Sequence, residues 1–218
     1  MPVNTVIFDM DGLLIDSEPH WQEAANETLQ LFNKKLTTEL YATTTGLRTK
    51  EFVHYWFRYF KIPAEEYAAA EKKITELVTE KIKKKPAVMP AVPYIINFFR
   101  ERNFKIGIAS SSPASIIEMV MQLCNITEFI HVYVSAEELQ YGKPHPQVYL
   151  ECAEQLDVDT SACICFEDSF NGMIAVKAAR MKCVIVPSLA AIRDPRWAAA
   201  DLKIASLQNF NELHLNMF

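Results

Sequence analysis

The chain has 218 residues, a formal net charge of −5 and a pI of about 5.6. An acidic chain lacks the basic face that nucleic-acid binding requires, so no nucleic-acid partner is expected. Its apolar runs fall short of the ~20 residues that span a bilayer, and residues 1–4 lack the charged start of a signal peptide. We therefore expect a cytoplasmic protein of one to two domains with no membrane partner.

The first half of the chain predicts one strand followed by a long helical segment. Residues 5–9 form an apolar, strand-like run. Residues 17–85, called the helical insert below, repeat apolar residues at three- and four-residue steps and show no strand-like alternation. Ser17 is expected to cap the first helix, with Pro19 in its first turn. A stretch of this length is adequate for an all-α domain that covers a site as a lid.

From residue 86 onward, apolar strands alternate with amphipathic helices. The expected strands cover residues 105–109, 130–134, 162–166 and 183–186, with a short edge strand at 202–205. This alternation predicts a parallel sheet covered by helices on both faces. The fold class is therefore α/β, with a Rossmann-like core of five to six strands. Residues 1–16 and 86–218 form this core domain, and residues 17–85 form the inserted all-α domain.

Polar residues follow four of the expected strands. They are Asp9 and Asp11 after the first strand, Ser110 and Ser111 after the second, Gly142, Lys143 and Pro144 after the third, and Glu167 and Asp168 after the fourth. Because the carboxyl ends of parallel strands meet at one edge of a sheet, these side chains are expected to share one site.

The chemistry of this set indicates a phosphate site. Carboxylates without histidine or thiolate partners favour a hard cation, above all Mg²⁺. A serine hydroxyl at a helix start binds anionic oxygens, and a lysine supplies a point charge suited to phosphate. Taken singly, Asp168 could cap a helix, Ser110 could be a turn serine and Lys143 a surface lysine. Their occurrence at four successive strand ends favours an active site with a carboxylate nucleophile.

Four short motifs closely resemble, in order, the signatures of the haloacid dehalogenase superfamily of aspartate-nucleophile phosphotransferases. They are Phe8-Asp9-Met10-Asp11-Gly12, Ala109-Ser110-Ser111, Gly142-Lys143-Pro144-His145-Pro146 and Phe166-Glu167-Asp168-Ser169. The resemblance covers essentially the whole chain, and the helical insert resembles the C1 cap of that superfamily. Within it, the chain looks most like bacterial sugar-phosphate phosphatases acting on hexose 6-phosphates such as 2-deoxyglucose 6-phosphate, with β-phosphoglucomutase as a near relative.

The resemblance implies catalytic roles. Asp9 would be the nucleophile that forms an aspartyl-phosphate. Asp11 would protonate the leaving alkoxide and then activate the hydrolytic water. Ser110 and the amide of Ser111 would hold the phosphoryl oxygens, and Lys143 would tie those oxygens to Asp9. Such a site works mainly by positioning and by neutralising charge.

The resemblance also implies a metal site and the remaining phosphate contacts. Asp9, the backbone carbonyl of Asp11, Asp168 and Glu167 would bind Mg²⁺. Gly12 would lie with the phosphate-binding residues.

Two positions in the helical insert bear on the substrate and the reaction. Arg48 falls where the superfamily places a substrate-specificity loop, so it would contact the sugar phosphate; a solvated surface arginine is the equal alternative. The mutase usually carries a histidine twelve residues after its nucleophile. Here Trp21 holds that position, and His20 lies one residue earlier, about 100° around a helix. This departure favours hydrolysis over the mutase reaction.

Two other protein classes use similar residues. A response-regulator-like module also surrounds a phosphorylated aspartate with acids, a hydroxyl and a lysine, but the helical insert and the Asp9-x-Asp11 spacing argue against it. A catalytically silent binding protein is disfavoured because every chemical residue is retained. We expect a monomeric enzyme acting on small phosphomonoesters, with hinges near Asp16 and residues 85–86.

Overall fold

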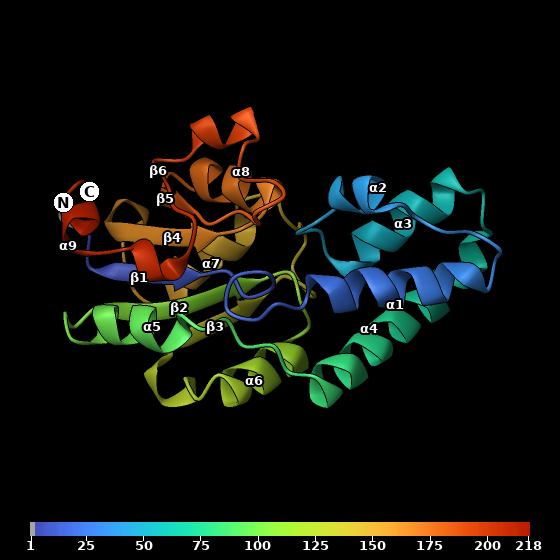
Figure 1. Ribbon diagram of the computed structural model, residues 1–218, viewed down its shortest axis with the longest axis horizontal. Coiled ribbons are helices and arrows are strands. Elements are labelled where there is room, and N and C mark those ends of the chain that lie inside the picture. Colours follow the sequence, from blue (N-terminus) through green and yellow to red (C-terminus); the bar gives the residue numbers. More distant parts are fainter. Residues whose placement is uncertain (1–2) are drawn as a thin grey trace.

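The centre of the molecule is a six-stranded parallel sheet with the order β3-β2-β1-β4-β5-β6 (Figure 1). The strands are β1 (Thr5–Phe8), β2 (Lys105–Ser110), β3 (Val132–Ser135), β4 (Cys163–Glu167), β5 (Lys182–Ile185) and β6 (Leu202–Lys203). The computed structural model describes residues 3–218, so the first two residues of the expected core segment lie outside it. The predicted α/β class and parallel sheet are confirmed.

Helices cover both faces of the sheet. They are α5 (Val92–Arg100), α6 (Ala114–Leu123), α7 (Gln147–Gln155) and α8 (Phe170–Ala178), and a short α9 (Glu212–Leu215) ends the chain. Val6 and Phe8 of β1 pack in the cluster that contains α5 and α6, whereas Ile7 packs in the cluster that contains α7 and α8. Because both faces are buried, the strands read as continuous apolar runs instead of alternating ones.

The helical insert lies to one side of the α/β part (Figure 1). Its helices are α1 (Glu18–Gln30), α2 (Thr38–Ala42), α3 (Thr49–Tyr59) and α4 (Tyr67–Lys84). Helix α4 packs against both α1 and α3. Trp56 and Phe57 of α3, together with Ile74 and Val78 of α4, are buried in the insert. The apolar faces of these amphipathic helices therefore pack together, and their buried residues are continuous with the cluster that contains β1, α5 and α6.

Two linkers join the insert to the sheet and run beside each other. The Asp16 amide donates to the Ala87 carbonyl (2.8 Å), and the Met89 amide donates to the Leu14 carbonyl (3.0 Å). Ser17 occupies the expected N-cap position of α1, with Pro19 in the first turn. Its hydroxyl forms no capping bond, however, because it donates to a carboxylate of the candidate site. Among residues 3–218, no helix is both long and apolar enough to cross a membrane.

Candidate active site

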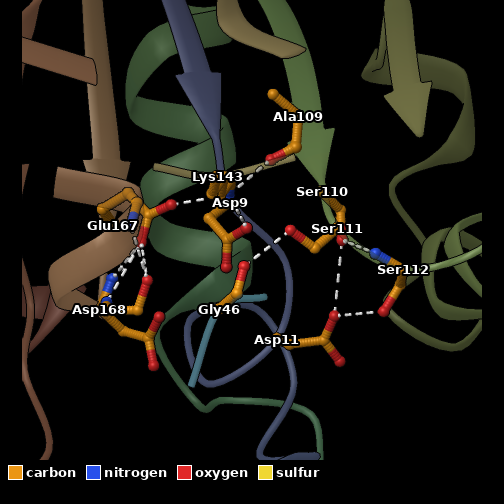
Figure 2. Close-up of polar contacts among 12 residues, drawn as sticks. Asp9, Asp11, Gly46, Ala109, Ser110, Ser111, Ser112, Lys143, Glu167 and Asp168 are labelled. Atoms are coloured by element: carbon orange, nitrogen blue, oxygen red, sulfur yellow. Dashed lines mark hydrogen bonds and ion pairs between the residues drawn. The ribbon is translucent and has the colours of Figure 1, made fainter. Parts of the chain in front are cut away.

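The residues predicted to share a site converge at the carboxyl edge of the sheet (Figure 2). Asp9 follows β1, the strand that lies between β2 and β4. Its amide donates to the Phe166 carbonyl (2.9 Å), which extends the pairing of β1 with β4 and fixes the Asp9 backbone. Strand β2 delivers Ser110, and β4 delivers Glu167. The site is thus centred on a fully buried strand in the middle of the sheet.

Lys143 binds two carboxylates from the interior of the site. Its Nζ lies 2.5 Å from Asp9 Oδ1 and 2.7 Å from Glu167 Oε1, and it also donates to the Ala109 carbonyl at 3.1 Å. Only 1% of the Lys143 side chain is exposed. Burial alone would lower the pKa of Lys143, but the carboxylates of Asp9 and Glu167 outweigh it and raise that pKa. The ammonium therefore stays charged beside Asp9.

Glu167 is fully buried, and both of its oxygens accept hydrogen bonds. Oε1 accepts from Lys143 and from the Tyr149 hydroxyl (2.6 Å). Oε2 accepts from the amide and hydroxyl of Ser169 and from the Asp168 amide, at 3.0–3.1 Å. Glu167 thus holds Lys143 in place, and this hydrogen-bond set leaves it less available than its neighbours as a metal ligand.

Three carboxylates form a cluster suited to a cation. Asp9, Glu167 and Asp168 each offer an oxygen within 4.8 Å of the others. Burial raises the pKa of Asp9 and of Asp168 well above the ordinary range, and the neighbouring carboxylates raise both further, with Lys143 opposing the change. Buried, oxygen-only donors with surplus negative charge fit a hard divalent cation. Asp9 and Asp168 are the freer donors of the three.

Gly12 permits the close approach of Asp168. Its φ is 75°, and a Cβ at this position would overlap the Asp168 carboxylate. The Gly12 amide donates to the Ile15 carbonyl (2.9 Å) within the turn. The structure therefore places Gly12 beside the acidic cluster, where its missing side chain matters more than its amide.

The serines at the end of β2 and just after it lie on the other side of Asp9. Ser110 is fully buried, and its Oγ accepts from the Ser112 amide at 3.0 Å. Ser111 lines the cavity in front of Asp9, and its hydroxyl donates to the Gly46 carbonyl of the helical insert at 2.7 Å. This part of the site is therefore in direct contact with the insert.

Asp11 accepts hydrogen bonds from both parts of the molecule. Its Oδ1 accepts from Ser17 Oγ (2.5 Å) and from the Trp21 indole (2.9 Å), which both lie at the start of the insert. Its Oδ2 accepts from Ser112 Oγ (2.7 Å) and lies 3.4 Å from Ser110 Oγ. Figure 2 shows this carboxylate turned toward Ser112, beside Asp9 and not against it.

A cavity opens between the acidic cluster and helices α1–α3, with Trp21, Tyr41 and Phe52 in its walls. Glu18 also lines it and accepts from the Tyr41 hydroxyl at 3.2 Å. Burial, and next the nearby Asp11 carboxylate, raises the pKa of Glu18 to about 7. The cavity thus combines an acidic end with aromatic walls and further hydrogen-bonding groups.

The structure does not place Arg48 in this cavity. Its guanidinium lies against the loop that follows β3, where it donates to backbone carbonyls. Sequence reasoning also gave no role to Glu18, Tyr41 or Tyr149. Glu18 was visible only as an acid in the first turn of a helix, and Tyr149 as an apolar position of α7. The sequence indicates Trp21 as an apolar position of a helix and as the residue where the mutase has its histidine, but not its hydrogen bond to Asp11.

An α/β sheet that presents an aspartate paired with a buried lysine, beside a carboxylate cluster and next to a helical insert, is suited to phosphoryl transfer. Residues 6–186 match the haloacid dehalogenase-like hydrolase family, and the chain belongs to that family. The expected family and enzyme class, a phosphoric monoester hydrolase, are confirmed.

Known relatives and structures extend this result. The chain is 37% identical to hexitol phosphatase B of Escherichia coli K12 over 203 residues, which cover 92% of this chain and 91% of that protein. It is 26% identical to the fructose-1-phosphate phosphatase of the same organism, over 83% of this chain and 95% of that protein. The fold matches that of β-phosphoglucomutase from Clostridium difficile with a TM-score of 0.88, at 20% identity over 99% and 96% of the two chains.

Proposed function

We propose that this protein is a Mg²⁺-dependent phosphatase that hydrolyses phosphomonoesters of hexoses or hexitols through an aspartyl-phosphate intermediate. Hexose 6-phosphates such as 2-deoxyglucose 6-phosphate are the preferred candidates. The observation that carries the proposal is the ion pair between Asp9 and the buried Lys143 at the acidic end of the cavity. The 37% identity to a hexitol phosphatase supports the substrate class.

Asp9 is the nucleophile in this proposal. It must be ionised to attack phosphorus, yet burial raises its pKa. The Lys143 ammonium at 2.5 Å opposes that shift and also supplies positive charge to the transferred group. Asp9 and Asp168, with the backbone carbonyl of Asp11, would hold Mg²⁺, which would neutralise further negative charge when bound. Glu167 completes the site by fixing Lys143.

Asp11 is the acid and base in this proposal. It would donate a proton to the departing sugar oxygen and later take one from the attacking water. The donors around it come from the insert, through Ser17 and Trp21, and from the core, through Ser110 and Ser112. The position of Asp11 therefore depends on how the insert lies on the core. We infer that residues 17–85 act as a cap hinged near Asp16 and residues 85–86.

The cavity walls favour a polyhydroxylated substrate. Trp21 and Phe52 offer apolar surface for the C–H groups of a sugar, and Glu18, Thr45 and Thr49 offer polar groups for its hydroxyls. Phosphotransfer between sugar phosphates is not favoured, because Trp21 holds the position of the histidine of the mutase. An indole N–H can only donate a hydrogen bond, whereas an imidazole can also accept a proton.

The test is phosphate release from a panel of hexose and hexitol phosphates with Mg²⁺, including β-glucose 1-phosphate with its bisphosphate activator. We expect release that is strongest for hexose or hexitol 6-phosphates and that is lost in Asp9→Asn. The matched control is Asp157→Asn, because Asp157 is exposed and remote from the site and its φ of 53° is tolerated by asparagine. Isomerisation without net release, or full activity in Asp9→Asn, would overturn the proposal.

A further inference from the structure

Arg48 joins the helical insert to the loop that leads into Lys143. It precedes α3, and only 8% of it is exposed. Its Nη1 donates to the carbonyls of Ala136 (3.0 Å) and Leu139 (2.6 Å), and its Nη2 lies 2.6 Å from Glu51 Oε1. Both carbonyls belong to the segment between β3 and Lys143. The guanidinium is thus bound to core backbone from within the insert.

Glu51 adds a second contact to the same loop. Its Oε1 accepts from the Gly142 amide at 3.3 Å, while Oε2 accepts from the Arg48 amide at 3.3 Å. Gly142 is packed so closely here that a Cβ would lie 2.5 Å from Arg48 Nε and 2.5 Å from Glu51 Oε2. The insert therefore reaches the residue immediately before Lys143.

These contacts depend on the planar guanidinium. Arginine can donate to two carbonyls and a carboxylate at once from a rigid fork, which a lysine ammonium on a flexible stem does less well. The two carbonyls and the Glu51 carboxylate lose this donor if Arg48 is removed, and buried polar groups without partners are costly. The arrangement forms only while the insert rests on residues 136–142.

We propose that Arg48 and Glu51 form a latch through which the helical insert fixes residues 136–142 and so positions Lys143 against Asp9. Arg48 is then a positioning residue for the reaction and not a ligand of the substrate. The loop it holds ends at the residue whose Nζ lies 2.5 Å from the Asp9 carboxylate. The inference rests on the phosphatase activity proposed above, but not on the identity of the sugar.

The kinetic test compares Arg48→Met with Arg58→Met, which changes an exposed arginine of α3, the helix that Arg48 precedes. Substrates are the best hexose phosphate of the panel and p-nitrophenyl phosphate, which has no sugar hydroxyls. A latch predicts that kcat falls about tenfold to a hundredfold for both substrates, because ~1 Å of misplacement costs about that much. KM should change less than about twofold, and Arg58→Met should match wild type. A rise in KM for the sugar phosphate alone, or unchanged constants, would overturn the latch.

A second variant tests the same contact from the other side. Gly142→Ala places a methyl group against Arg48 and Glu51, so it should lower kcat as Arg48→Met does. The double variant should lose no more than the worse single variant, because both changes break one contact. If the fold-losses in kcat of the two single variants instead multiply in the double variant, their effects are independent, which would count against the latch.

Hydrogen exchange provides a readout that needs no activity. Amide exchange of residues 136–142 should be at least severalfold faster in Arg48→Met and Gly142→Ala than in wild type or Arg58→Met. Unchanged exchange would refute the latch. A wild-type protein that releases no phosphate, with exchange altered as expected, would instead refute the proposed function and leave the latch standing.

Discussion

Trp21 donates a hydrogen bond to Asp11, the proposed acid and base, through an indole N–H that cannot accept one. Its indole N–H lies 2.9 Å from Asp11 Oδ1 and supports one orientation of that carboxylate. We expect Trp21→Phe to keep the aromatic wall and to lower kcat by about tenfold, a fraction of the 10²–10⁴ that general acid–base catalysis supplies. Phosphate release at saturating substrate measures this effect.

The control for this prediction is Trp197→Phe. The Trp197 indole also donates a hydrogen bond, to the Ala191 carbonyl at 2.7 Å, but it packs with α8 outside the cavity. Both variants should lose about 1 kcal/mol of unfolding free energy, the usual value of one hydrogen bond. Equal kcat values in the two variants would show that the Trp21 contact is structural only.

Lys143 is a cation held between two buried carboxylates. In Lys143→Met, Asp9 and Glu167 would face each other without their shared partner. We expect loss of activity and a destabilisation of about 3–5 kcal/mol at neutral pH, as for other broken buried ion pairs. The loss should shrink at acidic pH, where Asp9, whose pKa is raised by burial, becomes protonated. Urea unfolding at pH 5 and pH 7.5 measures both effects, and a pH-independent loss would contradict the electrostatic explanation.

The residues at strand ends could be predicted from sequence, and the residues that meet across the insert could not. Asp9 and Lys143 follow parallel strands, so the topology alone brings them to one edge. Arg48 and Trp21 meet their partners only through the way the insert rests on the core. Side chains on an amphipathic helix show which face is apolar, but they do not show what a polar group at its edge will contact.

The helices and strands also differ in how well the sequence predicts them. The strand ranges were predictable because continuous apolar runs alternate with helices. Helix α5 was not predicted, although Pro93 in its first turn and the apolar residues Ile95, Ile96 and Phe99 indicate a helix. A short, mostly apolar helix is easily missed in the sequence when prolines, which usually interrupt helices, precede it.

The loop between α2 and α3 connects the insert to the core at a position that requires glycine. Gly46 has φ 84°, and a Cβ there would lie 2.6 Å from Ser169 Oγ. Its carbonyl accepts from Ser111, and the neighbouring Thr45 carbonyl accepts from Asn171 (2.9 Å). This short segment therefore holds one wall of the cavity on the core.

We expect Gly46→Ala to displace this loop and raise KM for the preferred sugar phosphate by about tenfold, since left-handed backbone and a close contact both oppose a side chain. Asn171→Ala removes only one of the contacts and should raise KM less. Initial rates over a range of substrate concentrations measure both. An unchanged KM in Gly46→Ala would show that the loop does not shape the cavity.

For the whole molecule, the excess of carboxylates at the site links stability to pH and to metal. Asp9, Glu18 and Asp168 all have pKa values raised by burial, so the folded protein holds their protons more tightly than the unfolded chain. The stability from Glu18 is complete below its unfolded pKa of about 4.5. It is lost as the pH rises through its folded pKa of about 7.

We therefore expect the metal-free protein in EDTA to melt at a lower temperature at pH 8 than at pH 5.5. In a chain of this size, each kcal/mol corresponds to about 2–4 °C. Mg²⁺ should raise Tm more at pH 8 than at pH 5.5, because metal binding requires deprotonated carboxylates and stabilises only the folded state. Glu18→Gln should flatten the pH dependence in EDTA, whereas Glu154→Gln, at an exposed position, should not. A Tm that rises with pH in EDTA, or an equal effect of Mg²⁺ at both pH values, would mean that this cluster does not hold the excess negative charge that the proposed metal site requires.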